Sequence, residues 1–400
     1  MFAHIPAYAG DPILSLMEAY QADSRRQKAN LSIGLYYDDD GRIPVLGSVG
    51  AAVLQLAEQH GPHTYLPMEG MAPYRHALQQ LVFGSDSPAL KEKRVATIQS
   101  VGGSGALRIG AEFLKLYFPG CAVWISDPSW ENHQVLFAGA GVAVHTYPYY
   151  DPQTNGLRFG EMLATIRGLP ARSVVLLQPS CHNPTGIDLS REQWAELIEV
   201  LRQHGLIPFL DMAYQGFGHG LEEDAWPVRA LVDAGVSFLV SNSFSKNFSL
   251  YGERCGGLSV VTPNEDEANR VLGQLKAAVR RVYSSPPLHG ARLISTVLCD
   301  PALAGQWAAE VAQMRERIAR MRRSLRERLE ASLPGAPFDY LTTQRGMFSY
   351  TGLSGPEADC LREAHGVYVL RSGRLCVAGL NDTNLEHVAH AMATVLRARC

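Results

Sequence analysis

A single lysine, Lys246, follows an apolar run and stands among serines in the stretch VSFLVSNSFSKN, residues 236–247. No carboxylate occurs between this run and Glu253. A loop lysine usually extends its ammonium group into solvent, and this stretch alone favours that interpretation. An amine at the end of a buried strand can instead form an imine with a carbonyl compound. Ser243 and Arg254 flank the lysine. Arg254 could cap the end of the sheet, or it could bind a phosphate dianion through two parallel hydrogen bonds.

An acid and a phenol follow another apolar run. Asp211 comes directly after LIPFL, and Tyr214 comes three residues later. A buried carboxylate has to be paired or neutralised, because an unpaired charge is costly in the interior. Upstream, the turn PSCHNPTG carries His182 and Asn183. Since no second histidine lies at ligand spacing from His182, we expect no metal there. We interpret His182 as a structural residue or as one that supports a residue of the site without touching the ligand.

Two further features follow apolar runs nearer the N-terminus. GGSG at residues 102–105 comes after VATIQSV, and a helix starting near Ala106 would offer unpaired N–H groups to a phosphate. The glycine spacing matches neither the dinucleotide fingerprint nor the P-loop, so this indication is weak alone. Trp130 follows AVWIS and could stack on a flat ring, although most tryptophans fill the core.

The elements that must position these residues are seven apolar runs between residues 95 and 262. They are VATIQ, AVWIS, VAVHTY, SVVLLQ, LIPFL, VSFLV and GLSVV, and amphipathic stretches separate several of them. This alternation predicts an α/β fold with a mostly parallel seven-stranded sheet covered by helices. Ligands bind beyond the carboxyl ends of such strands. The residues there fit pyridoxal 5'-phosphate, which needs a phosphate anchor, ring stacking, a carboxylate and an amine, so we interpret Lys246 as the Schiff-base lysine.

The composition is that of a globular protein without a nucleic-acid or membrane partner. The 400 residues are 46% hydrophobic, and 36 basic against 39 acidic residues give a formal net charge of −3. No apolar run approaches the ~20 residues of a membrane span, and the N-terminus does not resemble a signal peptide. Seven cysteines without a CxxC pair fit reduced thiols, so we expect a cytoplasmic location.

The most charged stretch is RERIARMRRSLRER, residues 315–328. Ile318, Met321 and Leu325 recur at intervals of three and four, and Met314 extends this apolar stripe. The spacing predicts a long amphipathic helix whose arginines and glutamates face solvent. Interleaved glutamates argue against a nucleic-acid site.

Together these motifs resemble the aspartate and aromatic aminotransferases of fold type I. The segments that carry the resemblance are SxxK with Arg254, the HNPTG turn, DxAYQGF, and SGR at residues 372–374. The likeness extends from FAHIPAYAGDPIL to the last helix. It implies pyridoxal phosphate as cofactor and a homodimer with shared active sites. It also implies an N-terminal arm and part of a small α/β domain at residues 1–45, a large cofactor domain at 46–300, and the rest of the small domain at 301–400.

The resemblance assigns roles to individual residues. Lys246 would bind the cofactor and then shuttle the substrate proton, Asp211 would keep the pyridine nitrogen protonated, and Tyr214 would bond the ring oxygen. The other cofactor contacts would be Gly103, Ser104, Trp130, Asn183, Ser243, Arg254 and, from the partner chain, Tyr65. The substrate contacts would be Arg374 and Gly34 at the α-carboxylate, Arg280 from the partner chain at a side-chain carboxylate, and Trp130, Asn183, Leu35 and Tyr37.

The expected substrate entrance resembles the aromatic branch of the family. Leu35, Tyr37 and Ile43 in SIGLYYDDDGRIP are larger or less polar than is usual in aspartate-selective relatives, and apolar groups there favour ring burial by ~25 cal/mol per Å². Ser285 also resembles the aromatic type, whereas Thr64 departs from it. We therefore predict transamination of tyrosine and phenylalanine with 2-oxoglutarate, giving aryl-pyruvates and glutamate, with aspartate accepted as well.

Other functions remain open at this point. The nearest alternative is an aspartate aminotransferase with narrow dicarboxylate specificity. β-Elimination or decarboxylation on the same cofactor fits less well, because two arginines are expected at the substrate. A nicotinamide oxidoreductase would suit the sheet but lacks GxGxxG, and a non-catalytic binding module would need no proton-shuttling lysine.

Overall fold

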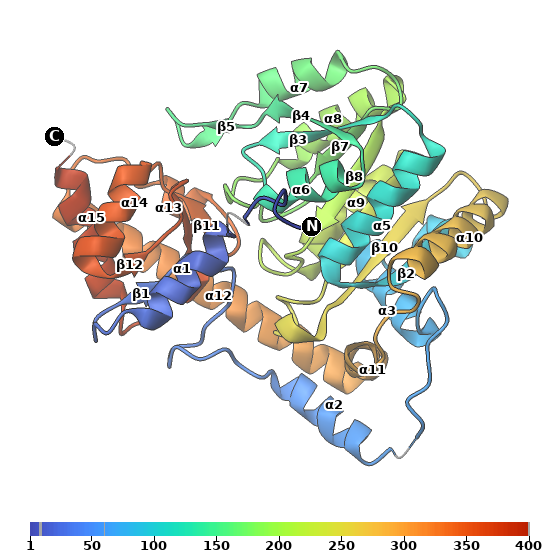
Figure 1. The fold of residues 1–400 in the computed structure, drawn as a ribbon, viewed down its shortest axis with the longest axis horizontal. Helices are drawn as coiled ribbons and strands as arrows, with labels where there is room; N and C mark the ends of the chain where they lie inside the picture. Colours follow the sequence, from blue (N-terminus) through green and yellow to red (C-terminus); the bar gives the residue numbers. More distant parts are fainter. Residues whose placement is uncertain (8–9, 60, 399–400) are drawn as a thin grey trace. The chain divides into compact units, whose positions relative to one another are not determined.

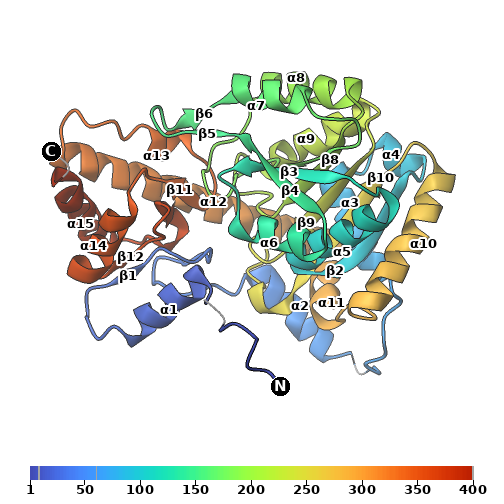
Figure 2. The same cartoon turned by 45° about the horizontal axis from the view of Figure 1, so that its top comes forward.

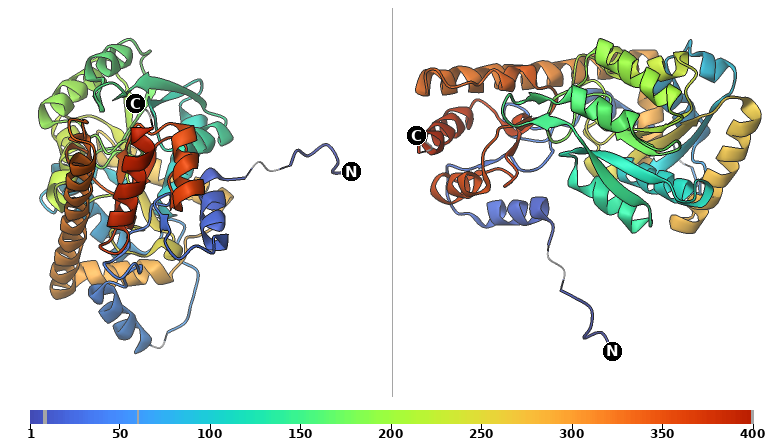
Figure 3. Two further views of the ribbon diagram at one scale, coloured as in Figure 1. Left: turned by 90° about the vertical axis from the view of Figure 1, so that its left-hand side faces the viewer. Right: turned by 90° about the horizontal axis from the view of Figure 1, so that it is seen from above.

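The structure is a computed structural model that describes residues 1–7, 10–59 and 61–398. Contacts divide the chain into a large unit, Pro44–Glu316, and a small unit made of Met1–Ile43 and Arg317–Cys400. The sequence-based boundaries are 45/46 and 300/301. The second of these lies at the start of helix α12 (Pro301–Ser332), whereas the structural division falls inside that helix, which Figure 3 shows as one continuous element.

Seven strands form the central sheet of the large unit, in the order β2-β10-β9-β8-β7-β3-β4 (Figure 1). Strand β10 is antiparallel to both of its neighbours, and the other neighbouring pairs are parallel. The strands are β2 (Val95–Val101), β3 (Ala122–Asp127), β4 (Ala143–Pro148), β7 (Val174–Leu177), β8 (Ile207–Met212), β9 (Phe238–Ser243) and β10 (Cys255–Val261). They correspond to the seven predicted runs, so the predicted mostly parallel sheet is confirmed.

Helices cover both faces of this sheet because its strands are apolar on both sides; every residue of β7, β9 and β10 is buried. On one face, α5 (Gly102–Tyr117), α6 (Glu131–Gly139) and α10 (Glu265–Val282) lie over the strands (Figure 2), and their apolar side chains form a single cluster with those of the strands. The helices of this unit are α2 (Gly47–Ala57), α3 (Ala72–Phe83), α4 (Pro88–Lys91), α5 (Gly102–Tyr117), α6 (Glu131–Gly139), α7 (Phe159–Arg167), α8 (Arg191–Gln203), α9 (Leu221–Asp233), α10 (Glu265–Val282) and α11 (His289–Cys299). A short hairpin joins β5 (Tyr150–Asp151) to β6 (Gly156–Leu157).

Helix α5 lies close to the sheet because a glycine faces the strands. A Cβ on Gly110 would lie 2.5 Å from the ring atom Cζ of Phe209 on β8, so any larger residue would push the helix away. The apolar residues Ala106, Ile109 and Phe113 recur on the same face and are buried. This packing fixes the N-terminus of α5 beside the carboxyl ends of the central strands.

The small unit is an α/β structure built from both ends of the chain, as predicted. Strand β1 (Ala29–Asn30) pairs in parallel with β12 (Val367–Tyr368), and β11 (Phe348–Tyr350) pairs antiparallel with β13 (Arg374–Cys376). Its helices are α1 (Pro12–Ala22), α13 (Tyr340–Thr343), α14 (Gly355–His365) and α15 (Leu385–Arg397). The β1–β12 pair ties the N-terminal segment to the C-terminal one.

Helix α12 carries the predicted apolar stripe. Met314, Ile318, Met321 and Leu325 are all buried, which confirms that part of the prediction. Within the described chain, no helix combines the length and the apolar character needed to cross a lipid bilayer.

The prediction that the arginines of this helix face solvent is wrong for Arg317 and Arg322, which are 9% and 3% exposed. The guanidinium of Arg322 donates to the carbonyls of Leu341 and Gly346 at 3.0 and 2.8 Å. Arg317 donates to the carbonyl of Leu380 at 2.8 Å. An arginine has five N–H donors, so it can be buried where its guanidinium donates hydrogen bonds to backbone carbonyls of turns. Sequence periodicity gives no sign of such an arrangement.

Candidate active site

The side chain of Asp211 lies at the carboxyl end of β8 and is nearly buried, at 7% exposed. Each of its oxygens accepts one hydrogen bond. Oδ2 lies 2.9 Å from Nε2 of His133, and Oδ1 accepts from the Ser241 hydroxyl at 2.8 Å. Because an ionised carboxylate only accepts hydrogen bonds, Nε2 of His133 is the donor. The buried carboxylate is therefore paired, as its position after an apolar strand requires.

Helix α6 brings His133 to this carboxylate. Nδ1 of His133 lies 2.8 Å from the hydroxyl of Ser129, so the ring is bonded on both sides. The ring of Trp130 meets the His133 ring edge-on, with 5.3 Å between centroids. Trp130, which was predicted to stack on a cofactor ring, thus lies beside the residue that contacts Asp211.

Lys246 and Tyr214 come together at the same edge of the sheet. Lys246 follows β9 by three residues, and its Nζ lies 5.3 Å from the centroid of the Tyr214 ring. Nδ2 of Asn183 lies 3.5 Å from the Tyr214 hydroxyl, which is a long contact. The backbone of Asn183 is fixed by Gln178, whose side chain accepts from its N–H at 2.8 Å and donates to its carbonyl at 3.0 Å. Three residues predicted from separate motifs are therefore neighbours.

The N-terminus of α5 meets the segment after β9. A Cβ on Gly103 would lie 3.2 Å from Cβ of Ser243, and one on Gly102 would lie 2.6 Å from Nη2 of Arg254. Gly102 has a φ of +66°, a conformation that favours glycine. Nη1 of Arg254 donates to the hydroxyl of Ser245 at 3.3 Å. A helix N-terminus, two hydroxyls and a guanidinium gathered in this way suit an anion, and Ser104 belongs to the same first turn.

His182 is buried and bonded at both ring nitrogens. Nε2 lies 2.8 Å from the Ser126 hydroxyl and Nδ1 lies 2.8 Å from that of Thr185. Its ring stacks on Tyr149 with 4.0 Å between centroids. Burial, and then the charge of His133, lower the pKa of His182 to about 3. These contacts agree with the interpretation of His182 as a structural residue.

In the small unit, Arg374 on β13 is held in one orientation. Its side chain is 2% exposed, Nη2 donates to the carbonyl of Ser32 at 2.7 Å, and the guanidinium lies 4.3 Å from the centroid of the Phe348 ring. Gly34 packs on the same ring, since a Cβ there would lie 2.8 Å from Cζ of Phe348. The two predicted α-carboxylate contacts therefore share one aromatic neighbour.

The segment that was predicted to select the substrate lies in the same unit. Leu35 and Tyr37 are half-buried, and Ile43 is exposed. The N–H of Tyr37 donates to the carbonyl of Ala378 at 3.1 Å. Burial raises the pKa of the Tyr37 phenol.

The two residues expected to act from a partner chain are exposed on the large unit. Tyr65 is 95% exposed, and Arg280, at the C-terminal end of α10, is exposed and contacts the hydroxyl of Ser284. Among the described residues, neither makes a hydrogen bond or an ion pair with Asp211, His133 or Ser241.

The sequence analysis missed three residues: His133 and Ser241, which contact Asp211 in the large unit, and Phe348, which contacts Arg374 in the small unit. Ser241 stands two residues before Ser243 and so shares its side of β9, a signal that the alternation of a strand could have given. His133 and Phe348 carry no comparable signal, because each acts through a contact with a segment far away in the sequence.

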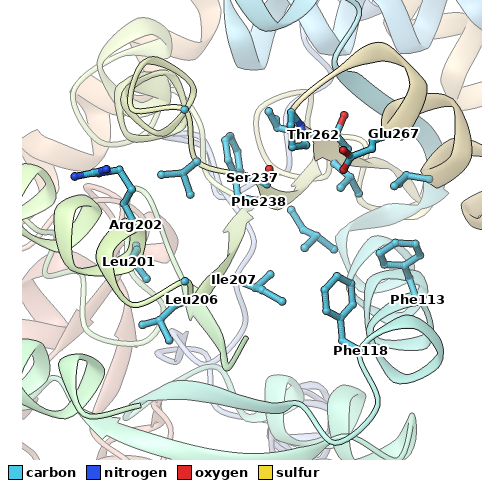
Figure 4. A pocket seen from close by; sticks show the side chains of 18 residues that line it. Phe113, Phe118, Leu201, Arg202, Leu206, Ile207, Ser237, Phe238, Thr262 and Glu267 are labelled. Atoms are coloured by element: carbon cyan, nitrogen blue, oxygen red, sulfur yellow. The ribbon is translucent and has the colours of Figure 1, made fainter. Parts of the chain in front are cut away.

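A separate cavity of about 400 Å³ lies at the opposite edge of the sheet (Figure 4). The beginnings of β8 and β9, at Ile207 and Phe238, line it together with Phe113 and Phe118. Asp211 and Ser243 stand at the other ends of these strands, so the cavity is separate from the residues around Asp211 and Lys246.

Comparisons with known proteins show the family to which this chain belongs. Residues 26–392 match the family Aminotransferase class I and II. The aromatic-amino-acid aminotransferase of Escherichia coli (strain K12) is 60% identical over 397 residues, covering 99% of this chain and all of that protein. The crystal structure of an aromatic amino acid aminotransferase from Burkholderia cenocepacia J2315 has a TM-score of 0.97 at 57% identity, over 100% of this chain and 99% of that one.

A third similar protein was solved with a cofactor. The aromatic-amino-acid aminotransferase from Burkholderia pseudomallei, covalently bound to pyridoxal phosphate, has a TM-score of 0.97 at 49% identity, over 99% of each chain. The fold is that of a pyridoxal-phosphate enzyme. This chain belongs to the class I and II aminotransferase family, and its cofactor is pyridoxal 5'-phosphate.

Proposed function

We propose that this aminotransferase moves the amino group of tyrosine or phenylalanine to 2-oxoglutarate, and that it also accepts aspartate. The observation that carries the proposal is the buried carboxylate of Asp211, held by His133 and Ser241 at the sheet edge that bears Lys246 and Tyr214. The names of the similar proteins support the aromatic preference. An aspartate aminotransferase of narrow specificity is the alternative.

The residues of the large unit fit the cofactor. Asp211 would accept from the ring nitrogen, Asn183 and Tyr214 would bond the ring oxygen, and Trp130 would cover the ring. The phosphate would be held by the backbone of Gly103 and Ser104, by Ser243 and Arg254, and by Tyr65 from a second copy of the chain. The support for this assignment is the close approach of α5 to Ser243 and Arg254, together with the paired state of Asp211.

Pyridoxal phosphate, when bound, draws electrons from the substrate's Cα and carries the amino group between the two half-reactions. The chain supplies the rest of the chemistry. Nζ of Lys246 would take the proton from the substrate's Cα and deliver it to the carbon C4′ of the cofactor. Because the amino group remains on the enzyme between half-reactions, ping-pong kinetics follow.

Substrate selection would rest on the small unit and on Arg280. Arg374 would bind the α-carboxylate bidentately, with the Gly34 backbone beside it. Leu35 and Tyr37 would contact an aromatic side chain. Arg280 from the second copy would bind the side-chain carboxylate of aspartate, glutamate or 2-oxoglutarate.

The proposal includes a homodimer with shared active sites in the cytoplasm. In the single chain, Tyr65 is 95% exposed and several apolar side chains near it in sequence face solvent, including Val45 at 77% and Leu54 at 70%. A second copy of the chain would cover apolar surface of this kind. The formal net charge of −3 and the reduced-thiol composition are compatible with the cytoplasm.

The experiment that tests the proposal compares kcat/KM for phenylalanine, tyrosine and aspartate, with saturating 2-oxoglutarate, on one purified sample. We expect the aromatic substrates to equal or exceed aspartate. A hundredfold preference for aspartate, about 2.7 kcal/mol in the transition state, would establish the narrow alternative. Absence of any amino-acid-dependent change in the cofactor's absorption would contradict transamination altogether.

A further inference from the structure

Ser241 stands directly opposite Asp211 in the central sheet. The two residues are register partners in the parallel pair β8–β9, so their side chains project from the same face. The hydroxyl of Ser241 is fully buried and donates to Oδ1 of Asp211 at 2.8 Å. Strand pairing itself therefore sets this contact.

A hydroxyl at this position needs a reason, because it is fully buried. Val240 precedes it on a strand whose six residues are all buried. A buried hydroxyl is costly unless it is hydrogen-bonded, and serine gives no advantage to a strand. The Asp211 carboxylate accepts the hydrogen bond that offsets the cost of burying the Ser241 hydroxyl, and the hydroxyl in turn pairs the buried carboxylate.

The arrangement of donors restricts how the carboxylate can turn. His133 on α6 contacts Oδ2, while Ser241 on β9 contacts Oδ1. The terminal torsion of aspartate is soft, so a single donor on one oxygen leaves the plane of the group poorly defined. Two donors from two different elements, one on each oxygen, define the plane. Each oxygen still has a lone pair for a further donor.

We propose that Ser241 is a positioning residue for the cofactor: its hydroxyl holds the Asp211 carboxylate in the orientation that accepts the N–H of the pyridine ring. This inference rests on the proposed function, because it assumes that Asp211 faces the ring nitrogen. Ser241 touches neither substrate nor cofactor in this role and acts through Asp211 alone.

The test measures binding instead of turnover. The dissociation constant of pyridoxamine 5'-phosphate is determined by equilibrium dialysis for the full-length wild-type chain and for Ser241→Ala. The same measurement is made with an analogue whose ring nitrogen is replaced by C–H. We expect Ser241→Ala to weaken the binding of pyridoxamine phosphate about tenfold, equivalent to ~1.4 kcal/mol. The binding of the analogue should weaken by about twofold or less, because only a ligand with the ring nitrogen contacts the Asp211 carboxylate through that position.

Two further variants separate positioning from general damage. Ser259→Ala removes another buried hydroxyl in the same sheet, one bonded to Thr97 at 2.8 Å, and should leave both constants unchanged. Ser241→Thr keeps the hydroxyl and should bind pyridoxamine phosphate within about threefold of wild type.

Equal losses for both ligands in Ser241→Ala, or no loss for either, would overturn the inference while the proposed function stands. If the wild-type chain binds both ligands equally well, Asp211 does not serve the ring nitrogen, and the inference and that part of the proposed function are both overturned.

Discussion

The guanidinium of Arg374 lies 4.3 Å from the centroid of the Phe348 ring, and its Nη2 donates to the carbonyl of Ser32 at 2.7 Å. One contact covers a face of the guanidinium and the other fixes one of its edges. Together these two contacts orient the planar guanidinium, whose fork of N–H groups matches the geometry of a carboxylate. Gly34 packs against the same ring, so the backbone that would assist the arginine is fixed by the same aromatic residue.

Replacing Arg374 by lysine should lower kcat/KM for phenylalanine and aspartate alike, because both substrates carry the α-carboxylate. Lysine keeps the charge but loses the planar fork, and we expect a loss of about a hundredfold, from ~2–3 kcal/mol. Arg371→Lys is the matched control, since Arg371 lies in the same turn and pairs with Asp359 near the surface. Loss confined to one substrate class would show that Arg374 does not bind the shared carboxylate.

Replacing Arg280 by alanine should instead separate the two substrate classes. We expect kcat/KM for aspartate to fall about a hundredfold, ~2.7 kcal/mol, whereas the phenylalanine half-reaction changes by no more than about threefold. The half-reactions are followed singly by cofactor absorbance, so that 2-oxoglutarate binding does not mask the result. Arg281 is the exposed neighbour of Arg280, and Arg281→Ala should change kcat/KM for neither aspartate nor phenylalanine. Equal losses for both amino acids would remove the assignment of Arg280 to the side-chain carboxylate.

Shared active sites can be tested by mixing two defective variants. Lys246→Ala should be almost inactive, and Arg280→Ala should be defective with aspartate. In a mixed dimer, one site receives both defects and the other receives neither. Co-refolding equal amounts should therefore restore aspartate transamination to about a quarter of the wild-type value. A mixture of Lys246→Ala with Asp211→Ala should restore nothing, because both residues would serve their own chain's site. No recovery in the first mixture would contradict shared sites.

The sheet could be predicted from the sequence because parallel strands are buried on both faces and therefore appear as short, nearly continuous apolar runs. All seven runs became strands, and VVLL and FLVSNS are buried throughout. The rule that ligands bind beyond strand carboxyl ends then located Asp211 and Lys246 at one edge. Neither step required knowledge of which strands are neighbours.

Contacts that depend on strand order or on loop paths could not be predicted. Ser241 meets Asp211 only because β9 lies next to β8 in a particular register. His133 reaches the same carboxylate from a helix 78 residues away in the sequence. Arg322 was expected in solvent, and it is buried because carbonyls of the segment after α13 meet its guanidinium. Periodicity describes one element at a time and contains no information of this kind.

Replacing Asp211 by alanine should lower the transamination rate by two to four decades. The change removes a buried charged partner, for which a loss of about 3–5 kcal/mol is usual. It also leaves His133 and Ser241 without their acceptor, so thermal unfolding of the variant must be measured beside the rate. Asp233→Ala, at the exposed end of α9, is the control. A loss of tenfold or less in a folded variant would mean that the ring nitrogen is held by another group.

His182 should make the protein less stable as the pH falls. Its pKa is about 3 in the folded chain, against an ordinary value of 6.5, because burial disfavours the charged ring. Below pH 6.5 the unfolded chain binds a proton at His182 that the folded chain does not bind. The part of the free energy of unfolding that depends on a neutral His182 is therefore fully present above pH 6.5 and is lost as the pH falls toward 3. Across this window the free energy of unfolding should fall by about 1.4 kcal/mol per pH unit on account of this residue.

The glutamine variant His182→Gln isolates this effect. Glutamine offers a donor and an acceptor to Ser126 and Thr185 but does not titrate. Urea unfolding at pH 7, 6 and 5, at one protein concentration, should give a pH slope smaller than that of the wild type by about the value of one proton. His390→Gln, on the exposed side of α15, should keep the wild-type slope. If His182→Gln shows the wild-type slope too, His182 is already protonated in the folded chain, and its two hydroxyl contacts would have to be assigned anew with both ring nitrogens as donors.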